Sequence, residues 1–289
     1  MMLLVGGDSE IGAATYRSLK AQGRPVYATT RRRDRVASDR PFLDLATELG
    51  DWAPPPGTHS ACIFLAIARL ADCANDPAGS AHINVTQTLR LIEWLVAQDI
   101  HVVFLSTNQV FDGMTPHVRP DAPTCPVSEY GRQKSRVEAS LRQHMDRGAP
   151  LAILRLGKVV SPVMPLIDNW IKALAAGKPI QAFRDMSLAP APVALVTDAI
   201  ARLMHDRVSG IYQLTGPRDA SYAEIGRFLA DRVGADPKLV TETSARDAGL
   251  PEGSTPRHTT LDSRVLRERY DLQVPDIWAI VEPMIAARG

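Results

Sequence analysis

The sequence carries almost no net charge. Its 289 residues include 33 Lys and Arg against 32 Asp and Glu, for a formal net charge of +1. This balance provides no basic field of the kind that nucleic-acid binding usually needs. Nucleic acid is therefore not expected as a partner.

The few cysteines and histidines lack the spacing of cross-links and metal sites. Cys62, Cys73 and Cys125 are odd in number and form no C-x-x-C pair. This usage is typical of free thiols in a reducing compartment rather than of a disulfide scaffold. No two of the seven histidines lie within five positions of each other, so the sequence predicts no metal site.

Long apolar runs are also missing. The N-terminal stretch MMLLVGGDSEIG has no basic region and reaches Gly6 after a few apolar residues, unlike a secretion signal or an anchor. No later run approaches the roughly 20 apolar residues of a membrane span. We therefore expect a cytoplasmic protein with no membrane partner. The 45% apolar content is sufficient for a core, and the length fits one large domain or two modest ones.

The first half of the chain alternates short apolar runs with amphipathic stretches. This alternation is typical of βα units, so we expect an α/β fold of the Rossmann type, with a doubly wound parallel sheet. Helices are predicted at residues 81–98 and 128–145, the second with Ser128 as its N-cap. The strand candidates are residues 2–6, 24–29, 60–66, 101–106 and 151–156.

The pattern loosens after about residue 157. Ser221 and Glu224 form a capping box at the start of one helix, and Thr197 is predicted as the N-cap of another. These segments are too short and interrupted to form a second large sheet. We predict a small C-terminal substrate-binding lobe at residues 158–188 and 216–289, added to an NADP-binding Rossmann domain at residues 1–157 to which residues 189–215 return.

A glycine-rich turn, VGGDSEIG, follows the first predicted strand. Such a turn lets the backbone approach a pyrophosphate, and the next helix presents unpaired N–H groups and a positive dipole. An ordinary strand-to-helix turn explains the motif equally well, because the middle glycine of the usual pattern is replaced by a serine. The loop residues expected at the cofactor are Gly6, Ser9, Glu10, Ile11 and Gly12.

An arginine run follows the second predicted strand. An NAD enzyme usually carries an acid there for the ribose 2′-hydroxyl, whereas an NADP enzyme needs cations for the 2′-phosphate. The run includes Arg31, Arg32 and Arg33, and the first acid after the strand is Asp34. A solvated basic loop is the alternative. The position favours NADP over NAD, with Arg31 and Arg32 as its ligands.

Tyr130 and Lys134 lie four positions apart in EYGRQKSRVE. On a helix this spacing places both side chains on one face, where the cation can lower the pKa of the phenol and make it a usable proton donor. The pair follows a strand end, STNQVFDG, which offers the hydroxyl of Thr107 at the carboxyl edge of the sheet. Y-x-x-x-K alone is common by chance, so the order of the three motifs carries the interpretation.

Taken in order, these motifs resemble the extended short-chain dehydrogenase/reductase superfamily and, within it, the dTDP-4-dehydrorhamnose reductase group. The resemblance covers nearly the whole chain. It rests on LVGGDSEIG, STNQVFDG, PVSEYGRQKSRVE and TPRHTTLDSRVL. The INV of residues 83–85 and the LDL of residues 43–45 also stand where the family has a helix asparagine and an adenine-facing aspartate.

The resemblance implies a catalytic role for three residues. Tyr130 would protonate the carbonyl oxygen of a keto-sugar, Lys134 would hold the nicotinamide ribose, and Thr107 would position the same oxygen. Arg257 would contact the pyrophosphate of a nucleotide-sugar substrate, with an ordinary surface arginine as the alternative. A homodimer is also implied.

The resemblance further implies a set of contacts with the adenosine half of the cofactor. Asp44 would accept a hydrogen bond from the adenine amino group. Asn84 is equally well explained as a buried amide that closes backbone hydrogen bonds. The cofactor residues implied in this way are Asp44, Leu45, Leu65, Ala66, Ala68 and Asn84.

One departure from the family narrows the chemistry. The family's S-T-D is S-T-N here, which places Asn108 next to the substrate, and the related dehydratases carry T-D-E where this chain has Thr107, Asn108 and Gln109. An amide cannot serve as a general acid or base at neutral pH, so dehydration lacks its carboxylates while carbonyl reduction does not need them.

We therefore expect NADP-dependent reduction of a nucleotide-activated keto-sugar, of the 4-ketoreductase type. Two alternatives stay open: a nucleotide-sugar epimerase on the same scaffold, and a non-catalytic NADP-binding regulatory subunit. The retained Thr107, Tyr130 and Lys134 favour an enzyme, and the arginine run favours a reductase that releases NADP.

Overall fold

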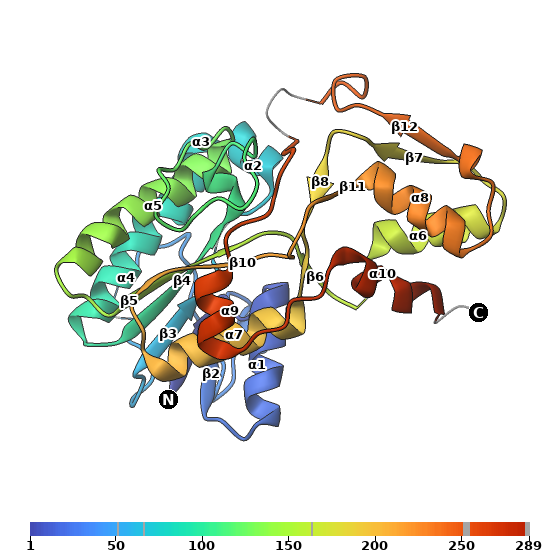
Figure 1. Cartoon of the computed structure of the whole chain (residues 1–289). Coiled ribbons are helices and arrows are strands. Elements are labelled where there is room, and N and C mark those ends of the chain that lie inside the picture. Colours follow the sequence, from blue (N-terminus) through green and yellow to red (C-terminus); the bar gives the residue numbers. More distant parts are fainter. Residues whose placement is uncertain (51, 66, 163, 251–254, 287–289) are drawn as a thin grey trace. The chain divides into compact units, whose positions relative to one another are not determined.

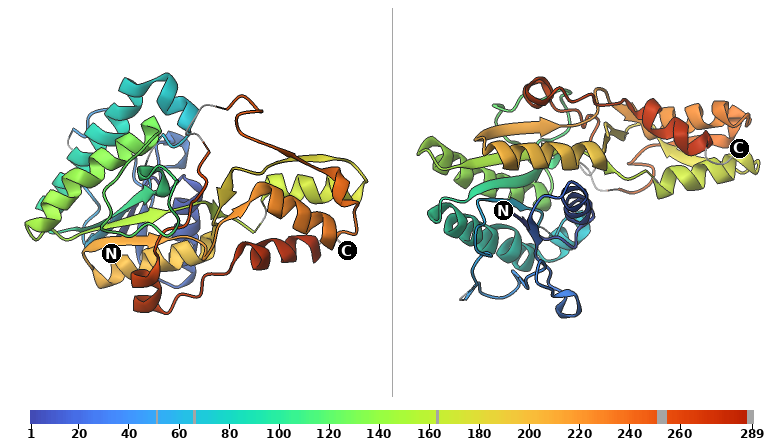
Figure 2. Two further views of the ribbon diagram at one scale, coloured as in Figure 1. Left: turned by 45° about the horizontal axis from the view of Figure 1, so that its top comes forward. Right: turned by 90° about the horizontal axis from the view of Figure 1, so that it is seen from below.

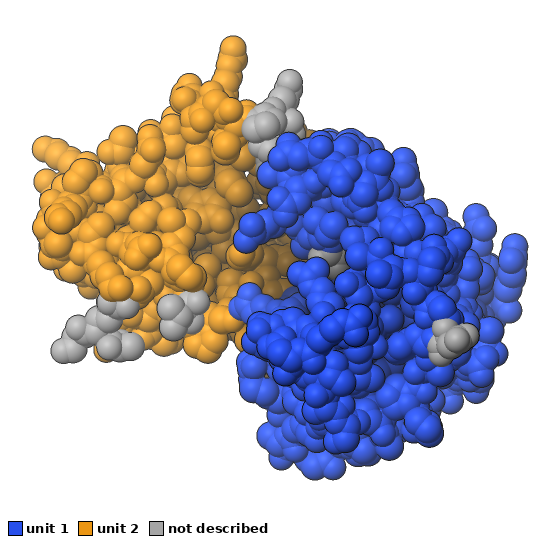
Figure 3. Space-filling model, turned by 180° about the vertical axis from the view of Figure 1, so that it is seen from behind, with its two compact units in different colours: residues 1–110, 123–155, 194–212 blue, residues 111–122, 156–193, 213–289 orange. Residues whose placement is uncertain are grey.

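The computed structural model describes residues 1–50, 52–65, 67–162, 164–250 and 255–286. The chain divides into two compact units, which Figure 3 shows in separate colours. Unit 1 comprises residues 1–110, 123–155 and 194–212. Unit 2 comprises residues 111–122, 156–193 and 213–289.

Six strands form one sheet in the order β10-β5-β4-β3-β1-β2 (Figure 1). β1 pairs in parallel with β2 and β3, and β3 pairs in parallel with β4. Strands β1, β3, β4 and β5 are buried along their whole length, as expected of parallel strands with helices on both faces. The predicted Rossmann-type α/β fold is confirmed. The strands are β1 (Met2–Val5), β2 (Val26–Ala28), β3 (Ser60–Ile63), β4 (His101–Thr107), β5 (Leu151–Leu156) and β10 (Gly210–Leu214).

The strand order reverses at β1. The chain passes from β1 to β2 on one side and then returns to β3 on the other. Right-handed crossovers in opposite directions place α1 and α4 on opposite faces of the sheet, and Figure 1 shows α4 beside α5, away from α1. Ligands of such folds bind outside the carboxyl ends of the strands at this reversal. The helical segments between the strands are α1 (Glu10–Ala21), η1 (Arg33–Arg35), α2 (Leu70–Asn75), α3 (Pro77–Ala81), η2 (His82–Gln87), α4 (Thr88–Ala97), η3 (Asn108–Val110), α5 (Glu129–Asp146) and α7 (Val193–Asp206).

The core of unit 1 fixes α5 against the sheet. Val137 and Leu141, one turn apart on α5, are fully buried with Leu91 and Leu95 of α4 and the strand residue Phe104. Positions four apart share a helix face, so this apolar face of α5 turns toward the sheet. The same packing sets the orientation of the first turns of α5.

Two predicted helices differ in detail from the structure. Residues 81–97 are helical, but the segment contains the end of α3, the π-helical η2 and then α4. Thr197 is not an N-cap, because α7 begins at Val193, directly after Pro192, and already includes it. The Thr197 hydroxyl instead donates to Ala194 O at 2.8 Å inside the helix.

The N-cap predicted for α5 is confirmed: Ser128 Oγ accepts a hydrogen bond from Gly131 N at 3.0 Å.

Unit 2 has its own core and three two-stranded sheets, β11-β8, β12-β7 and β6-β9, so the expected absence of a second large sheet holds among the described residues. Ile171, Leu174, Ile225, Leu229 and Val281 are buried where α6 packs against α8 and α10 (Figure 2). The capping box at the start of α8 is confirmed. The elements of unit 2 are β6 (Val159–Val160), α6 (Pro165–Ala175), β7 (Ile180–Phe183), β8 (Ser187–Leu188), β9 (Ala191–Pro192), β11 (Ala220–Ser221), α8 (Tyr222–Arg232), η4 (Pro237–Leu239), β12 (Val240–Thr243), α9 (Arg264–Tyr270) and α10 (Ile277–Ala286).

Within the described ranges, no helix combines the length and apolar content needed to cross a bilayer. The same residues contain no group of three His, Cys, Asp or Glu side chains that could hold a metal ion.

Candidate active site

The glycine loop joins β1 to α1 in a tight, backbone-lined turn. Gly6 has φ of +89°, and a Cβ atom there would lie 3.1 Å from Leu65 Cδ2. A side chain at this position would therefore meet both backbone strain and a close neighbour. Ser9 occupies the position of the middle glycine because it caps α1: its Oγ accepts from Gly12 N at 3.1 Å and donates to Gly6 O at 2.9 Å.

A cavity of about 270 Å³ opens beside this loop, in unit 1. It lies at the carboxyl ends of β1 and β3, where the strand order reverses. Six residues predicted at the cofactor line it, namely Gly6, Ser9, Arg31, Asp44, Leu45 and Leu65. The sequence analysis missed the other lining residues, which are Asp8, Thr29, Leu43, Ala46, Phe64, Ile67 and Ile83.

Other residues predicted at the cofactor do not line this cavity. Glu10, Ile11 and Gly12 form the first turn of α1, and Ala68 is exposed. Arg32 is half-exposed and forms an ion pair with Asp34 at 3.0 Å. Ala66 lies outside the described residues.

Asn84 is buried in the π-helical segment η2 and has protein partners on both sides of its amide. Its Oδ1 accepts from Ile67 N at 2.8 Å, and its Nδ2 donates to Ile67 O at 3.1 Å and to Gln133 Oε1 at 2.7 Å. Asn84 thus closes backbone hydrogen bonds of a residue that lines the cavity. The sequence analysis did not identify Gln133. The signal that could have found it is its position, because it is a polar residue among the buried residues of α5.

The side chain of Lys134 is fixed between β4 and the cavity. Its Nζ donates to Leu105 O at 2.8 Å and to Leu65 O at 3.4 Å, and it lies 4.3 Å from the centroid of the Phe104 ring. Because the side chain is buried, desolvation lowers the pKa of Lys134 to about 7, against the opposing charge of Glu138. An ammonium has three donors, so two bonds to carbonyls leave a third for a ligand.

Tyr130 lies one turn before Lys134 on α5, as the spacing predicts. Lys134 Nζ is 5.9 Å from the centroid of the Tyr130 ring. Desolvation raises the pKa of Tyr130, and the nearby Cys73 adds to the rise. The expectation that Lys134 lowers the pKa of the phenol is therefore not met, because the cost of burying the phenolate dominates.

Thr107 ends β4, and its Oγ1 accepts a hydrogen bond from Gln109 N at 3.2 Å. The same hydroxyl donates to Asn108 Oδ1 at 3.4 Å, a long contact. Gly131 allows α5 to begin against this strand end: a Cβ atom there would lie 2.1 Å from Gln109 O. The glycine after Tyr130 is thus a requirement of packing between α5 and η3.

A buried ion pair lies one turn beyond Lys134 on α5. Arg155 Nη2 donates to Glu138 Oε2 at 2.7 Å, and Ser106 Oγ donates to Glu138 Oε1 at 2.6 Å. The pair is almost fully buried, and Arg142 Nη2 lies 3.7 Å from the same Glu138 Oε2, so two cations compensate the buried carboxylate. It holds β5 and the end of β4 to α5.

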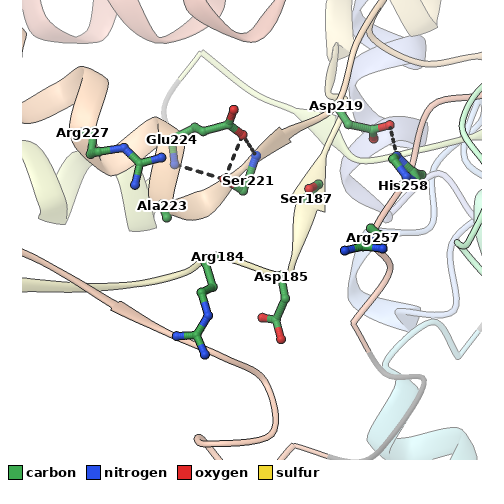
Figure 4. Close-up of a pocket in the computed structure, with 10 residues that line it drawn as sticks. All are labelled: Arg184, Asp185, Ser187, Asp219, Ser221, Ala223, Glu224, Arg227, Arg257 and His258. Atoms are coloured by element: carbon green, nitrogen blue, oxygen red, sulfur yellow. Dashed lines mark hydrogen bonds and ion pairs between the residues drawn. The ribbon is translucent and has the colours of Figure 1, made fainter.

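Unit 2 contains a separate cavity of about 580 Å³, which Arg257 lines (Figure 4). The lining residues are Arg184, Asp185, Ser187, Asp219, Ser221, Ala223, Glu224, Arg227, Arg257 and His258. Asp219 organises one wall, because its carboxylate accepts from Thr259 N at 2.6 Å, from Thr260 Oγ1 at 2.8 Å and from His258 Nδ1 at 3.1 Å. Arg257 itself is exposed.

Residues 1–288 match the family described as RmlD substrate binding domain. The chain belongs to this family. It is thus a member of a sugar-nucleotide reductase and epimerase family, and an NAD(P)-dependent oxidoreductase of the extended short-chain dehydrogenase/reductase type. The predicted resemblance is confirmed, and so is the prediction of an enzyme of this type.

Similar proteins agree with the family assignment. The probable low-salt glycan biosynthesis reductase Agl14 of Haloferax volcanii is 24% identical over 90% of this chain and 88% of its own length. A crystal structure of dTDP-4-dehydrorhamnose reductase from Bacillus anthracis in complex with NADP has a TM-score of 0.79 and 17% identity, over 99% of this chain and 98% of that one. The UDP-glucose 4-epimerase of Thermus thermophilus in complex with NAD has a TM-score of 0.73 and 20% identity, over 93% and 92%. These structural likenesses show a shared fold.

Proposed function

We propose that this protein uses NADPH to reduce the keto group of a nucleotide-linked keto-sugar, most simply a 4-keto-sugar. The observation that carries the proposal is the position of Lys134. Its Nζ donates hydrogen bonds both to Leu105 O on β4, the strand that ends at Thr107, and to Leu65 O at the wall of the unit 1 cavity. The same Nζ lies 5.9 Å from the centroid of the Tyr130 ring. The Lys134 side chain therefore lies beside both the predicted proton donor, Tyr130, and the predicted cofactor site.

The unit 1 cavity suits the adenosine and pyrophosphate parts of a dinucleotide. Gly6 presents bare backbone, and α1 begins beside it with its unpaired N–H groups. Asp44 Oδ1 accepts a hydrogen bond from Ala46 N at 3.0 Å and still has lone pairs for an amino group. Leu45 and Leu65 supply apolar surface for an adenine ring or its ribose.

Arg31 supports NADP over NAD as the cofactor. It lines the cavity just after β2, where the ribose 2′ substituent is recognised in folds of this type. Its guanidinium has no hydrogen bond or ion pair with the residues that the structure describes, so its charge is available to a phosphate. Arg32, in contrast, is already paired with Asp34.

The catalytic side chains would neutralise the charge that reduction creates. A bound dihydronicotinamide supplies a hydride to the carbonyl carbon. The Tyr130 hydroxyl gives its proton to the carbonyl oxygen, and the Lys134 ammonium stabilises the resulting phenolate. Thr107, at the end of β4, donates a hydrogen bond to the same oxygen.

Asn108 and Arg257 are proposed to meet the sugar nucleotide. Asn108 follows Thr107 directly and offers both a donor and an acceptor for sugar hydroxyls. Arg257 is exposed at the unit 2 cavity, and its planar fork suits phosphate oxygens. Because amides stand where dehydratases carry acids, water loss is not part of this proposal.

The proposal is tested by following NADPH oxidation at pH 7 against a panel of nucleotide-linked 4-keto-sugars. A positioned acid contributes about 10² to 10⁴-fold to such a step, so Tyr130→Phe should lower kcat by that factor while the Kd for NADPH is unchanged. Tyr212→Phe is the matched control: Tyr212 lies on β10, its hydroxyl donates to Ser209 O at 3.2 Å, and it lines neither the unit 1 cavity nor the unit 2 cavity, so kcat should be unchanged.

Each alternative function has its own outcome in this test. Interconversion of nucleotide sugars with tightly held NAD and no net oxidation of NADPH would replace the reductase by an epimerase. Tight binding of NADPH without turnover on any keto-sugar would support a regulatory subunit. Loss of kcat in both tyrosine variants would contradict the catalytic role of Tyr130.

A further inference from the structure

The glycine loop carries an acid, Asp8, that reaches the end of β2. Its Oδ2 accepts a hydrogen bond from Thr30 Oγ1 at 2.6 Å, and its Oδ1 accepts one from Arg40 Nη2 at 2.7 Å. Arg35 Nη1 lies 3.5 Å from the same Oδ1. The Asp8 carboxylate thus lies at the end of β2, where an NAD enzyme usually carries an acid for the ribose 2′-hydroxyl.

The chain after β2 folds back to bring these arginines to Asp8. Thr30 and Phe42 form a bridge, and the backbones of Ala37 and Arg40 exchange hydrogen bonds. Arg40 is thereby turned inward, and its Nε is buried without a hydrogen-bond partner in the described part of the chain. The charge on Arg40 is compensated by Asp8, which makes the position of each depend on the other.

Asp8 lines the same cavity as Arg31. A 2′-phosphate bound by Arg31 would share this space with the Asp8 carboxylate, and like charges at close range repel. A ribose 2′-hydroxyl, in contrast, can donate to that carboxylate, whose two oxygens have more lone pairs than their present partners use. The two residues therefore favour different cofactors.

We propose that Asp8 limits how strongly the protein prefers NADPH over NADH, and that the Arg40 cation partly compensates the charge of Asp8. The inference rests on the proposed function, because it assumes that the unit 1 cavity holds the adenosine end of a dinucleotide. Asp8 favours the 2′-hydroxyl of NADH, Arg31 favours the 2′-phosphate of NADPH, and Arg40 sets the balance.

The proposal predicts opposite effects for two variants. Asp8→Asn removes the repelling charge and frees that of Arg40, so the affinity ratio of NADPH to NADH should rise about tenfold, the size of one charge-assisted contact. Arg40→Gln leaves Asp8 without its main cation, so the same ratio should fall about tenfold. A purely structural role of either residue would weaken both dinucleotides alike.

The experiment measures the Kd of NADPH and of NADH for each variant by the fluorescence of the bound nicotinamide, with no sugar present. Asp39→Asn is the matched control: this acid lies in the same loop and pairs with Lys20 at 2.7 Å, but it does not line the cavity and its cation is not a predicted cofactor ligand, so its ratio should equal that of the wild type. Thermal unfolding of each variant without ligand checks that it folds. If Asp8→Asn fails to fold, the fall expected for Arg40→Gln carries the test alone.

The outcomes separate the inference from the proposed function. An unchanged ratio in Asp8→Asn and Arg40→Gln, with both dinucleotides bound by the wild type, would overturn the role of Asp8 and leave the reductase proposal standing. Failure of the wild type to bind either dinucleotide would overturn both.

Discussion

Burial of Lys134 predicts an unusual pH dependence of stability. Desolvation lowers the pKa of Lys134 from 10.5 to about 7 in the folded protein. Between these values the unfolded chain binds more protons than the folded one, so the free energy of unfolding rises with pH. Integration from pH 6.5 to pH 8.5 gives a rise of about 2 kcal/mol from this one group. Below pH 6.5 the cost of burying the charged amine is almost fully present.

The measurement compares the wild type with Lys134→Met, by urea unfolding at pH 6.5 and pH 8.5 without cofactor. Burial also lowers the pKa of His59 and His101, which adds to the rise in both proteins and cancels in the comparison. The raised pKa values of Cys62 and Cys73 act in the opposite direction only as the pH passes the ordinary thiol range, above this window. An equal rise in the two proteins would refute the argument that Lys134 is buried with a lowered pKa.

Three further substitutions test separate parts of the site. Gly131→Ala places a methyl group against Gln109 O, and should lower the free energy of unfolding by about 1–3 kcal/mol in urea titrations, because α5 must move away from η3. Arg31→Ala should raise the Kd for NADPH about tenfold or more in fluorescence titrations and leave that for NADH nearly unchanged; an equal loss for both would contradict a contact with the 2′-phosphate. Arg257→Ala should raise KM for the sugar nucleotide in initial-rate assays while the Kd for NADPH stays constant, and a loss of NADPH binding would place this residue elsewhere.

The sequence predicted the features of the fold that depend on local patterns. The apolar runs located β1, β3, β4 and β5, and the N-cap of α5 followed from Ser128 alone. Thr197 was misassigned because a threonine inside a helix can bond back to a carbonyl, a choice that depends on where the helix has already begun. The π-helical segment η2 had no local signal in the sequence, and its buried Asn84 bonds to Ile67 and Gln133, which are distant along the chain.

Residues of the candidate site could be predicted from the sequence only where they belong to a known motif. The glycine loop, Asp44 and the pair of Tyr130 and Lys134 were predicted from motifs, and the structure places Lys134 against the cavity wall. Asp8 was missed because its contact with Arg40 spans 32 positions and depends on the fold of the loop after β2. The pKa of Tyr130 was predicted with the wrong sign, because burial of a helix face does not follow from its spacing.

The central claim, hydride transfer to a sugar carbonyl with a proton from Tyr130, is tested most directly by isotope transfer. The purified protein would be incubated with NADPH carrying deuterium at the transferable position of C4 and with a nucleotide-linked 4-keto-sugar, and the product analysed by NMR. The account predicts one deuterium at the former carbonyl carbon of the sugar, with transfer slowed about 10² to 10⁴-fold in Tyr130→Phe. A sugar product without deuterium at that carbon, or equal transfer by Tyr130→Phe, would contradict it.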